Sequence, residues 1–244
     1  MNRYTKNTIT GFALVALLTS GTTAALAHTG TMNTANNSDV SALLVDLTEF
    51  LKNVQGNLNG EVAPSTQTKA ADLRVGLNAL LREHVNLGML ALYNVIDNDD
   101  ATSASVAALD NNTNELAATV GSVYGEDAQE AFDEIWTAHI GFFANYATGL
   151  RTNDTDMRVR AEADLQSYQT DISNFFNGAL PAIAKETVIN GSGEHKDLLI
   201  EAMDQYHAGN YAAAYQAQRE ADKQIAGIAN LLAKEIVNQN PDLF

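Results

Sequence analysis

Apolar residues recur three and four positions apart along nearly the whole chain after Asp39. This spacing places them on one face of an α-helix, whereas a half-buried strand alternates every second residue. One such stripe consists of Leu73, Leu77, Leu80, His84, Leu87 and Ala91. Three prolines and 7% aromatic residues in 244 positions also favour helices over a β-sandwich. The sequence therefore predicts an all-α protein.

Seven helices are predicted, separated by turns that contain glycine, proline, asparagine or aspartate. Their ranges are 39–57, 68–97, 101–123, 126–151, 155–178, 181–208 and 211–238. We place Pro181 in the first turn of the sixth helix, where the missing backbone donor costs nothing. Short connections between long helices require antiparallel neighbours, so we expect an up-and-down bundle of about seven helices.

Three histidines recur along this pattern at intervals of 55 and 56 residues: His84, His139 and His195. Each lies on the apolar stripe of its helix, fourteen or fifteen residues before a polar turn, and is expected to point inward. The spacing indicates an internal repeat whose unit is a helical hairpin.

A polar residue occupies the matching position on each intervening helix. Asp46, Glu115, Asp171 and Gln224 each directly precede an apolar residue of the stripe, so they flank the core. Counted from the turns, each of the last three lies at about the same height as the histidine of the preceding helix. The chain therefore looks like 3.5 helical-hairpin repeats that pair an inward histidine with an acid or amide.

The first residues have the features of a secretory signal peptide. Arg3 and Lys6 precede the apolar run 11–18, and Ala25-Leu26-Ala27 is a small-x-small cleavage signal. We expect residues 1–27 to be removed and the protein to be secreted, to an extracellular, cell-surface or periplasmic location. Residues 28–38 are polar and predict a flexible leader. The bundle domain is then 39–244.

Charge and composition exclude several classes of function. The chain has 14 Lys and Arg against 30 Asp and Glu, a net charge of −16, so binding to a nucleic acid is not expected. The absence of cysteine excludes disulfides and thiolate chemistry. No later segment is apolar over 18 residues, so we expect no stable membrane insertion of the mature chain. No complete catalytic motif is present, which favours a binding or interaction protein over an enzyme.

Imidazole and carboxylate groups at matching heights in a bundle are typical of metal sites. The first candidate site combines His84, Glu115 and His139, with Asp46 as a possible fourth ligand. The second, Asp171, His195 and Gln224, is poorer because an amide is a weak ligand. The metal would be copper, zinc or iron, held for storage, buffering or sensing. The alternative is a non-catalytic extracellular interaction or structural module in which the histidine–acid pairs serve only the core.

Several short motifs resemble a family of secreted bacterial helical-bundle proteins, some of which are labelled copper amine oxidase-like. The motifs are Leu81-Arg82-Glu83-His84-Val85, residues 121–125, residues 136–146, Ala208-Gly209-Asn210-Tyr211 and Arg219-Glu220-Ala221. The family's pattern matches the three repeated histidines and the acids at 115 and 171. It usually has a further histidine where this chain has Gln224. The resemblance implies a helical bundle and an association with copper, and it implies no particular activity.

Overall fold

The computed structural model describes residues 66–244, and this part of the chain is all-helical. Its six helices are α2 (Lys69–Asp97), α3 (Thr102–Tyr124), α4 (Glu126–Thr152), α5 (Thr155–Ala179), α6 (Lys185–His207) and α7 (Tyr211–Gln239). The predicted helix at 39–57, with the signal peptide and the leader, lies outside the described residues. For the other six predicted helices, five begin and end within one residue of the sequence prediction.

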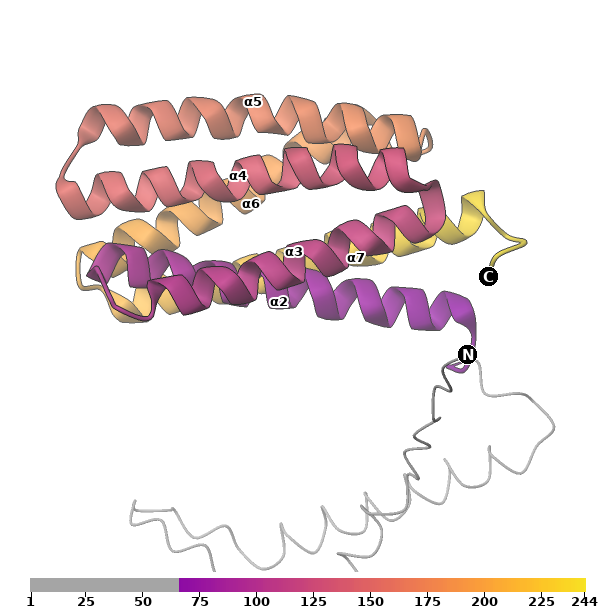
Figure 1. Cartoon of the computed structure of the whole chain (residues 1–244), viewed down its shortest axis with the longest axis horizontal. Helices are drawn as coiled ribbons and strands as arrows, with labels where there is room; N and C mark the ends of the chain where they lie inside the picture. The colour runs from indigo at the N-terminus through magenta and orange to yellow at the C-terminus, as the bar shows by residue number, and fades with distance from the viewer. Residues whose placement is uncertain (1–65) are drawn as a thin grey trace, which may run out of the picture. The chain divides into compact units, whose positions relative to one another are not determined.

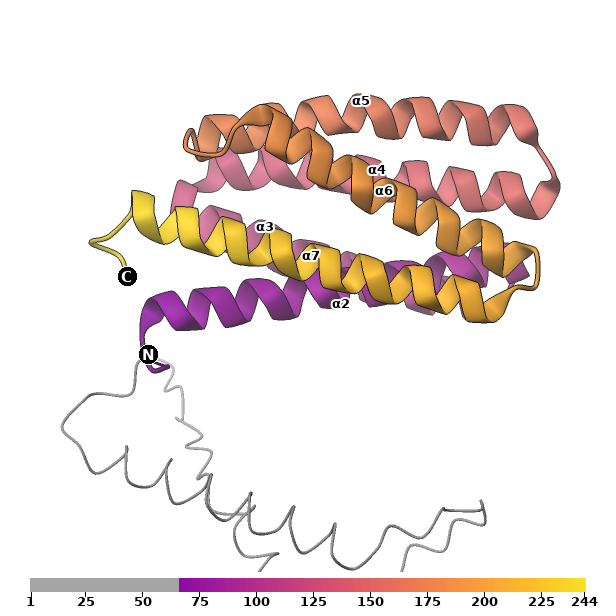
Figure 2. The same cartoon turned by 180° about the vertical axis from the view of Figure 1, so that it is seen from behind.

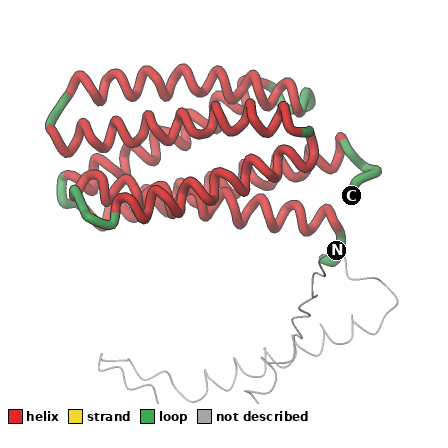
Figure 3. Tube along the Cα trace, viewed as in Figure 1, coloured by secondary structure: helices red, strands yellow, loops and turns green. Residues whose placement is uncertain are grey.

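Each helix packs against the next one along the chain, and α7 returns to pack against α2, which closes the ring. The loops join neighbouring ends, so consecutive helices are antiparallel (Figure 3). Helices α4 and α5 form one long pair, and α6 runs diagonally from the α5 side to the α7 side (Figures 1 and 2). Helices α2, α4 and α6 also contact one another across the middle of the ring.

The helix ends are set by the turn residues that the sequence supplies. Asn98 and Asn153 adopt the left-handed conformation, with φ of 56° and 55°, and end α2 and α4. Asparagine tolerates this region better than most residues that have a Cβ atom. Helix α5 begins after Asp154, whose side chain accepts a hydrogen bond of 2.9 Å from the backbone N–H of Met157.

The start of the sixth helix differs from the prediction. Helix α6 begins at Lys185, and Pro181 lies in the preceding turn instead of in the first helical turn. Leu180 and Ile183 explain the difference, because both are buried from this turn and anchor it to the core. Asn177 fixes the turn further by donating a hydrogen bond of 3.1 Å to the carbonyl of Ile183. Tertiary packing therefore overrides the local preference of proline here.

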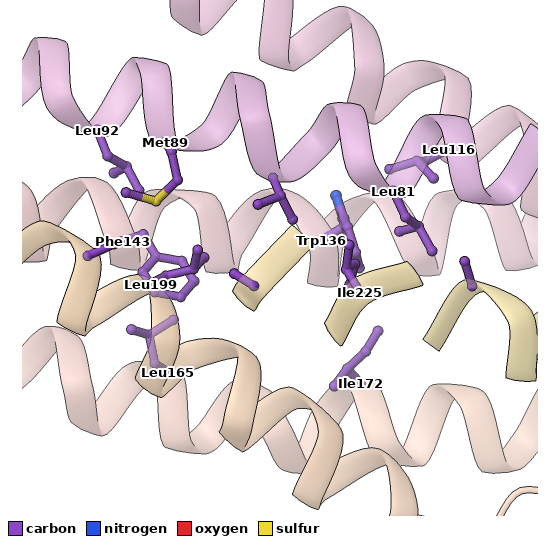
Figure 4. Close-up of a cluster of buried hydrophobic side chains, with 14 of the residues drawn as sticks. Leu81, Met89, Leu92, Leu116, Trp136, Phe143, Leu165, Ile172, Leu199 and Ile225 are labelled. Atoms are coloured by element: carbon purple, nitrogen blue, oxygen red, sulfur yellow. The ribbon is translucent and has the colours of Figure 1, made fainter. Parts of the chain in front are cut away.

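Every described helix contributes to one apolar core. Figure 4 shows representative side chains, and the labelled set contains at least one residue from each helix. In the order α2 to α7, one labelled residue of each helix is Leu81, Leu116, Trp136, Ile172, Leu199 and Ile225. Within residues 66–244, no helix is both long enough and apolar enough to cross a membrane.

Candidate functional site

The three repeated histidines lie near the middle of alternate helices: His84 on α2, His139 on α4 and His195 on α6. These helices run in the same direction, because each is separated from the next by one antiparallel helix. They are also the helices that meet across the bundle. His84 and His139 are 5% and 4% exposed, and His195 is half-buried. The fold therefore brings three distant histidines into one layer of the core.

Aromatic rings surround two of these imidazoles. The centroids of the His84 and His139 rings are 5.5 Å apart. The Trp136 ring contacts both imidazoles, and its centroid lies 4.8 Å from that of His84 and 4.7 Å from that of His139. Tyr168 of α5 stacks on His139 with centroids 4.6 Å apart and an interplanar angle of 18°. The imidazoles thus lie in surroundings that are apolar apart from a few polar atoms.

Burial keeps all three imidazoles neutral at physiological pH. The pKa of His84 is lowered to about 3, first by desolvation and then by the charge of the nearby His195. The pKa of His139 is also well below 6.5, because of burial first and then the charges of His84 and His195. Desolvation lowers the pKa of His195 to about 4. A proton on any one of them therefore disfavours a proton on the others.

Gln224 fixes the tautomer of His195. Its amide nitrogen donates a hydrogen bond of 2.8 Å to the carbonyl of Gly191, which leaves the amide oxygen facing the imidazole. This oxygen lies 3.1 Å from Nδ1 of His195. Because an amide oxygen can only accept, Nδ1 carries the proton and Nε2 carries a lone pair.

The other two histidines have neighbouring acceptors at comparable positions. The Asn112 side chain raises the pKa of His84, and the Trp136 backbone raises that of His139. A neighbour has this effect by facing the ring N–H as a hydrogen-bond acceptor. The contacts are loose, since Nδ1 of both rings and Oδ1 of Asn112 form no hydrogen bond of normal geometry. Buried polar atoms in this state are rare and costly.

All three histidines line one cavity of about 120 Å³. The cavity is lined mainly by the first halves of α2, α4 and α6 and by the second halves of α3, α5 and α7. Because neighbouring helices are antiparallel, these halves lie at the same end of the bundle. The turn that contains Leu180 and Ile183 also lines it. A second cavity of about 50 Å³ shares His84, His139 and Phe143 with the first, so these residues separate the two.

The acids of the predicted metal sites do not join the histidines. Glu115 and Asp171 are exposed, and Asp46 lies outside the described residues. Both acids precede a buried residue, Leu116 or Ile172, and a one-residue step along a helix turns a side chain by roughly 100°. Of the predicted pairs between residues 66 and 244, only His195 with Gln224 forms a hydrogen bond.

The described residues therefore do not provide the donor set of a ready metal site. Within 66–244, no group of three or more His, Cys, Asp or Glu side chains is arranged to hold a metal ion. His84 and His139 are close to each other, but no carboxylate of residues 66–244 lines the cavity with them. Of the predicted metal ligands, the fold brings the three histidines together at one cavity.

The sequence interpretation missed Asn112 and Tyr168, and it treated Trp136 only as a core aromatic. Asn112 could have been found, because it occupies an apolar-stripe position between Leu109 and Leu116 and is only 3% exposed. Its amide also donates to the carbonyl of Leu80 at 3.0 Å. Tyr168 occupies the same kind of stripe position, between Leu165 and Ile172, but its stacking on His139 depends on how α5 packs against α4.

Comparisons with protein-family models, with curated proteins and with solved structures found no match to this chain. The geometry of the site is therefore the basis on which a function can be assigned to this chain.

Proposed function

We propose that this protein is a non-catalytic binding protein that holds a small, largely apolar molecule in the histidine-lined cavity. The observation that carries the proposal is the cavity of about 120 Å³ inside the core, walled by apolar side chains and three neutral imidazoles. Pockets for small molecules typically combine apolar walls with a few polar groups, and in bundles they lie between the helices.

The energetic cost of the cavity supports this proposal. Protein interiors are close-packed, and an unfilled cavity costs roughly 24 cal/mol per Å³. The cavity is partly open to solvent, so at 120 Å³ the cost is up to about 3 kcal/mol, a large part of the stability of an ordinary domain. A bound molecule would recover much of this free energy, because it supplies the missing contacts.

Thermal unfolding of the full chain with and without toluene tests the proposal. A ligand at ten times its Kd stabilises the folded state by about 1.4 kcal/mol and raises Tm. Val188→Phe, at a position that lines the cavity, should remove this response because the larger ring fills the space. Val159→Phe, at a site 61% exposed on α5, is the matched control. An equal response in both variants, or a Tm that responds neither to toluene nor to its hydroxyl analogue phenol, contradicts the proposal.

Metal binding is a second candidate, in a narrower form than the sequence predicts. The 5.5 Å separation of the His84 and His139 rings favours it, because copper or zinc binds neutral imidazole. Glu115, Asp171 and Asp46 are then not required, and His195 or an external ligand would complete the coordination. Added zinc or copper should raise Tm at about pH 7 in the wild-type chain but not in His84→Ala. An unchanged Tm in both eliminates this candidate.

We also propose that the protein acts outside the cell membrane and contains the full repeat. The signal-like residues 1–27 support export. Intact-mass measurement of protein from its native host tests the export, since retention of Met1–Ala27 would contradict it.

The position of one histidine near the middle of each of α2, α4 and α6 supports the hairpin repeat. A seventh helix at 39–57 would supply the remaining half unit.

A further inference from the structure

The polar groups on the cavity wall determine which small molecule fits it. No aspartate or glutamate lines the cavity among residues 66–244, and its one charged lining residue, Lys196, is paired with Asp197 at 2.6 Å. Thr119 and Ser192 also line it, but each hydroxyl donates to a carbonyl one turn earlier in its own helix, at 2.8 Å. Tyr124, Tyr168 and Thr187 line it as well, and their hydroxyls can also accept. The ring nitrogens of the imidazoles are the strongest uncharged acceptors on this wall.

His195 presents the best-defined of these acceptors. Its Nδ1–H is bound to Gln224, so the lone pair of Nε2 is the part of the ring left for a ligand. His84 and His139 line the same cavity and are more deeply buried. A molecule in the cavity that carries an O–H or N–H group can therefore donate to an imidazole without displacing any existing hydrogen bond.

Aromatic side chains form the apolar wall. Phe132 stacks on Trp136 with centroids 5.0 Å apart and contacts Phe175 at 5.7 Å. Trp136 lies among Leu81, Leu116 and Ile225 in the core (Figure 4). Aromatic rings prefer such offset or edge contacts with another flat ring. The volume of about 120 Å³ is of the same order as that of an engineered cavity of about 150 Å³, lined by Leu, Ile and Phe, that binds benzene.

We propose that the cavity binds a small aromatic molecule with one hydrogen-bond donor, such as phenol or indole, and that the donor group binds Nε2 of His195. The inference rests on the proposed binding function and specifies its ligand class. The aromatic ring packs against the Phe132 and Trp136 wall, and the single donor satisfies the imidazole acceptor. A molecule without a donor leaves the acceptor unpaired, and a cation is desolvated without a counter-ion among the described lining residues.

Comparison of phenol with toluene tests the inference, because the two differ by a hydroxyl in place of a methyl group. A purely apolar cavity prefers toluene, since phenol loses its hydrogen bonds to water on entry. With the imidazole acceptor, the full chain should bind phenol at least tenfold more tightly than toluene by calorimetry. The ¹⁵N resonance of His195 Nε2 should shift on addition of phenol and stay in place with toluene.

His195→Leu identifies the acceptor, and His207→Leu is the matched control because His207 is exposed at the end of α6. His195→Leu should lose at least tenfold in phenol affinity and keep its affinity for toluene, which also shows that the variant is folded. If the variant does not fold, the ¹⁵N shift in the wild-type chain decides. Toluene binding as tight as phenol, or no shift at Nε2, overturns this inference and leaves the binding function intact. If neither molecule binds, both proposals fail.

Discussion

At the scale of single residues, the pKa of His195 depends on the neighbour that accepts the hydrogen bond from its ring N–H. Gln224 contributes an uncharged oxygen at 3.1 Å from His195, so its hydrogen bond offsets only part of the desolvation and the pKa remains about 4. A carboxylate at the same position would stabilise the imidazolium ion far more. The choice of amide therefore keeps His195 neutral and preserves the Nε2 lone pair.

Gln224→Glu should raise the pKa of His195, measured by NMR titration of its ring. Stability at pH 7 should fall by about 1 kcal/mol, because the carbonyl of Gly191 loses its donor. Between about pH 6.5 and 5 the variant should be less sensitive to acid than the wild type, since the folded protein now takes up a proton too. Gln218→Glu, where the glutamine contacts Asn86 at 3.3 Å, is the control. An unchanged His195 pKa would contradict the assignment of the contact.

At the scale of the helices, local sequence and close packing make different demands on glycine. Gly191 lies inside α6, and a Cβ atom there would meet only Ile228, at an ordinary 3.5 Å. Gly149 lies near the end of α4, and a Cβ atom there would lie 2.7 Å from Cγ of Arg158 and 3.0 Å from the carbonyl oxygen of Asp154. The same substitution should therefore have opposite effects at the two sites.

Gly191→Ala should raise the free energy of unfolding by about 0.5–1 kcal/mol, the usual gain in helix propensity. Gly149→Ala should lower it by about 1–2 kcal/mol, because the turn between α4 and α5 must shift to admit the methyl group. Urea denaturation of both variants measures the difference. The reverse order of stability would show that the turn at Gly149 adapts freely and that the α6–α7 contact does not.

At the scale of the whole molecule, the three imidazoles form one group that resists protonation. The pKa values of His84 and His195 fall to about 3 and 4 on folding, and that of His139 also falls well below 6.5. The unfolded chain, whose histidines titrate near 6.5, then binds more protons than the folded one below that pH. Stability is thus fully present above about pH 6.5 and is lost as the pH falls toward the folded values.

The free energy of unfolding should accordingly be level from pH 8 to 7 and then decrease. Each histidine contributes a slope of about 1.4 kcal/mol per pH unit, so the three together give up to about 4 kcal/mol per unit. Urea denaturation from pH 8 to 5 measures this slope. His207→Ala should leave it unchanged, because that side chain is exposed. A free energy of unfolding that stays constant between pH 7 and 5.5 would show that the folded protein protonates the three histidines as readily as the unfolded chain does.

The sequence alone was sufficient for five of the six described helices, to within one residue at each end, and for the burial of His84 and His139. Apolar periodicity selects the face that packs inward, and the turn residues at 98, 125, 153 and 209 interrupt the backbone, so both depend on near neighbours along the chain. The tertiary structure decided what the periodicity leaves open. It turned Glu115 and Asp171 to solvent, moved the start of α6 to Lys185 and placed Tyr168 on His139. These outcomes depend on how six helices rotate and tilt to fill a common volume, a condition that no single helix carries in its own sequence.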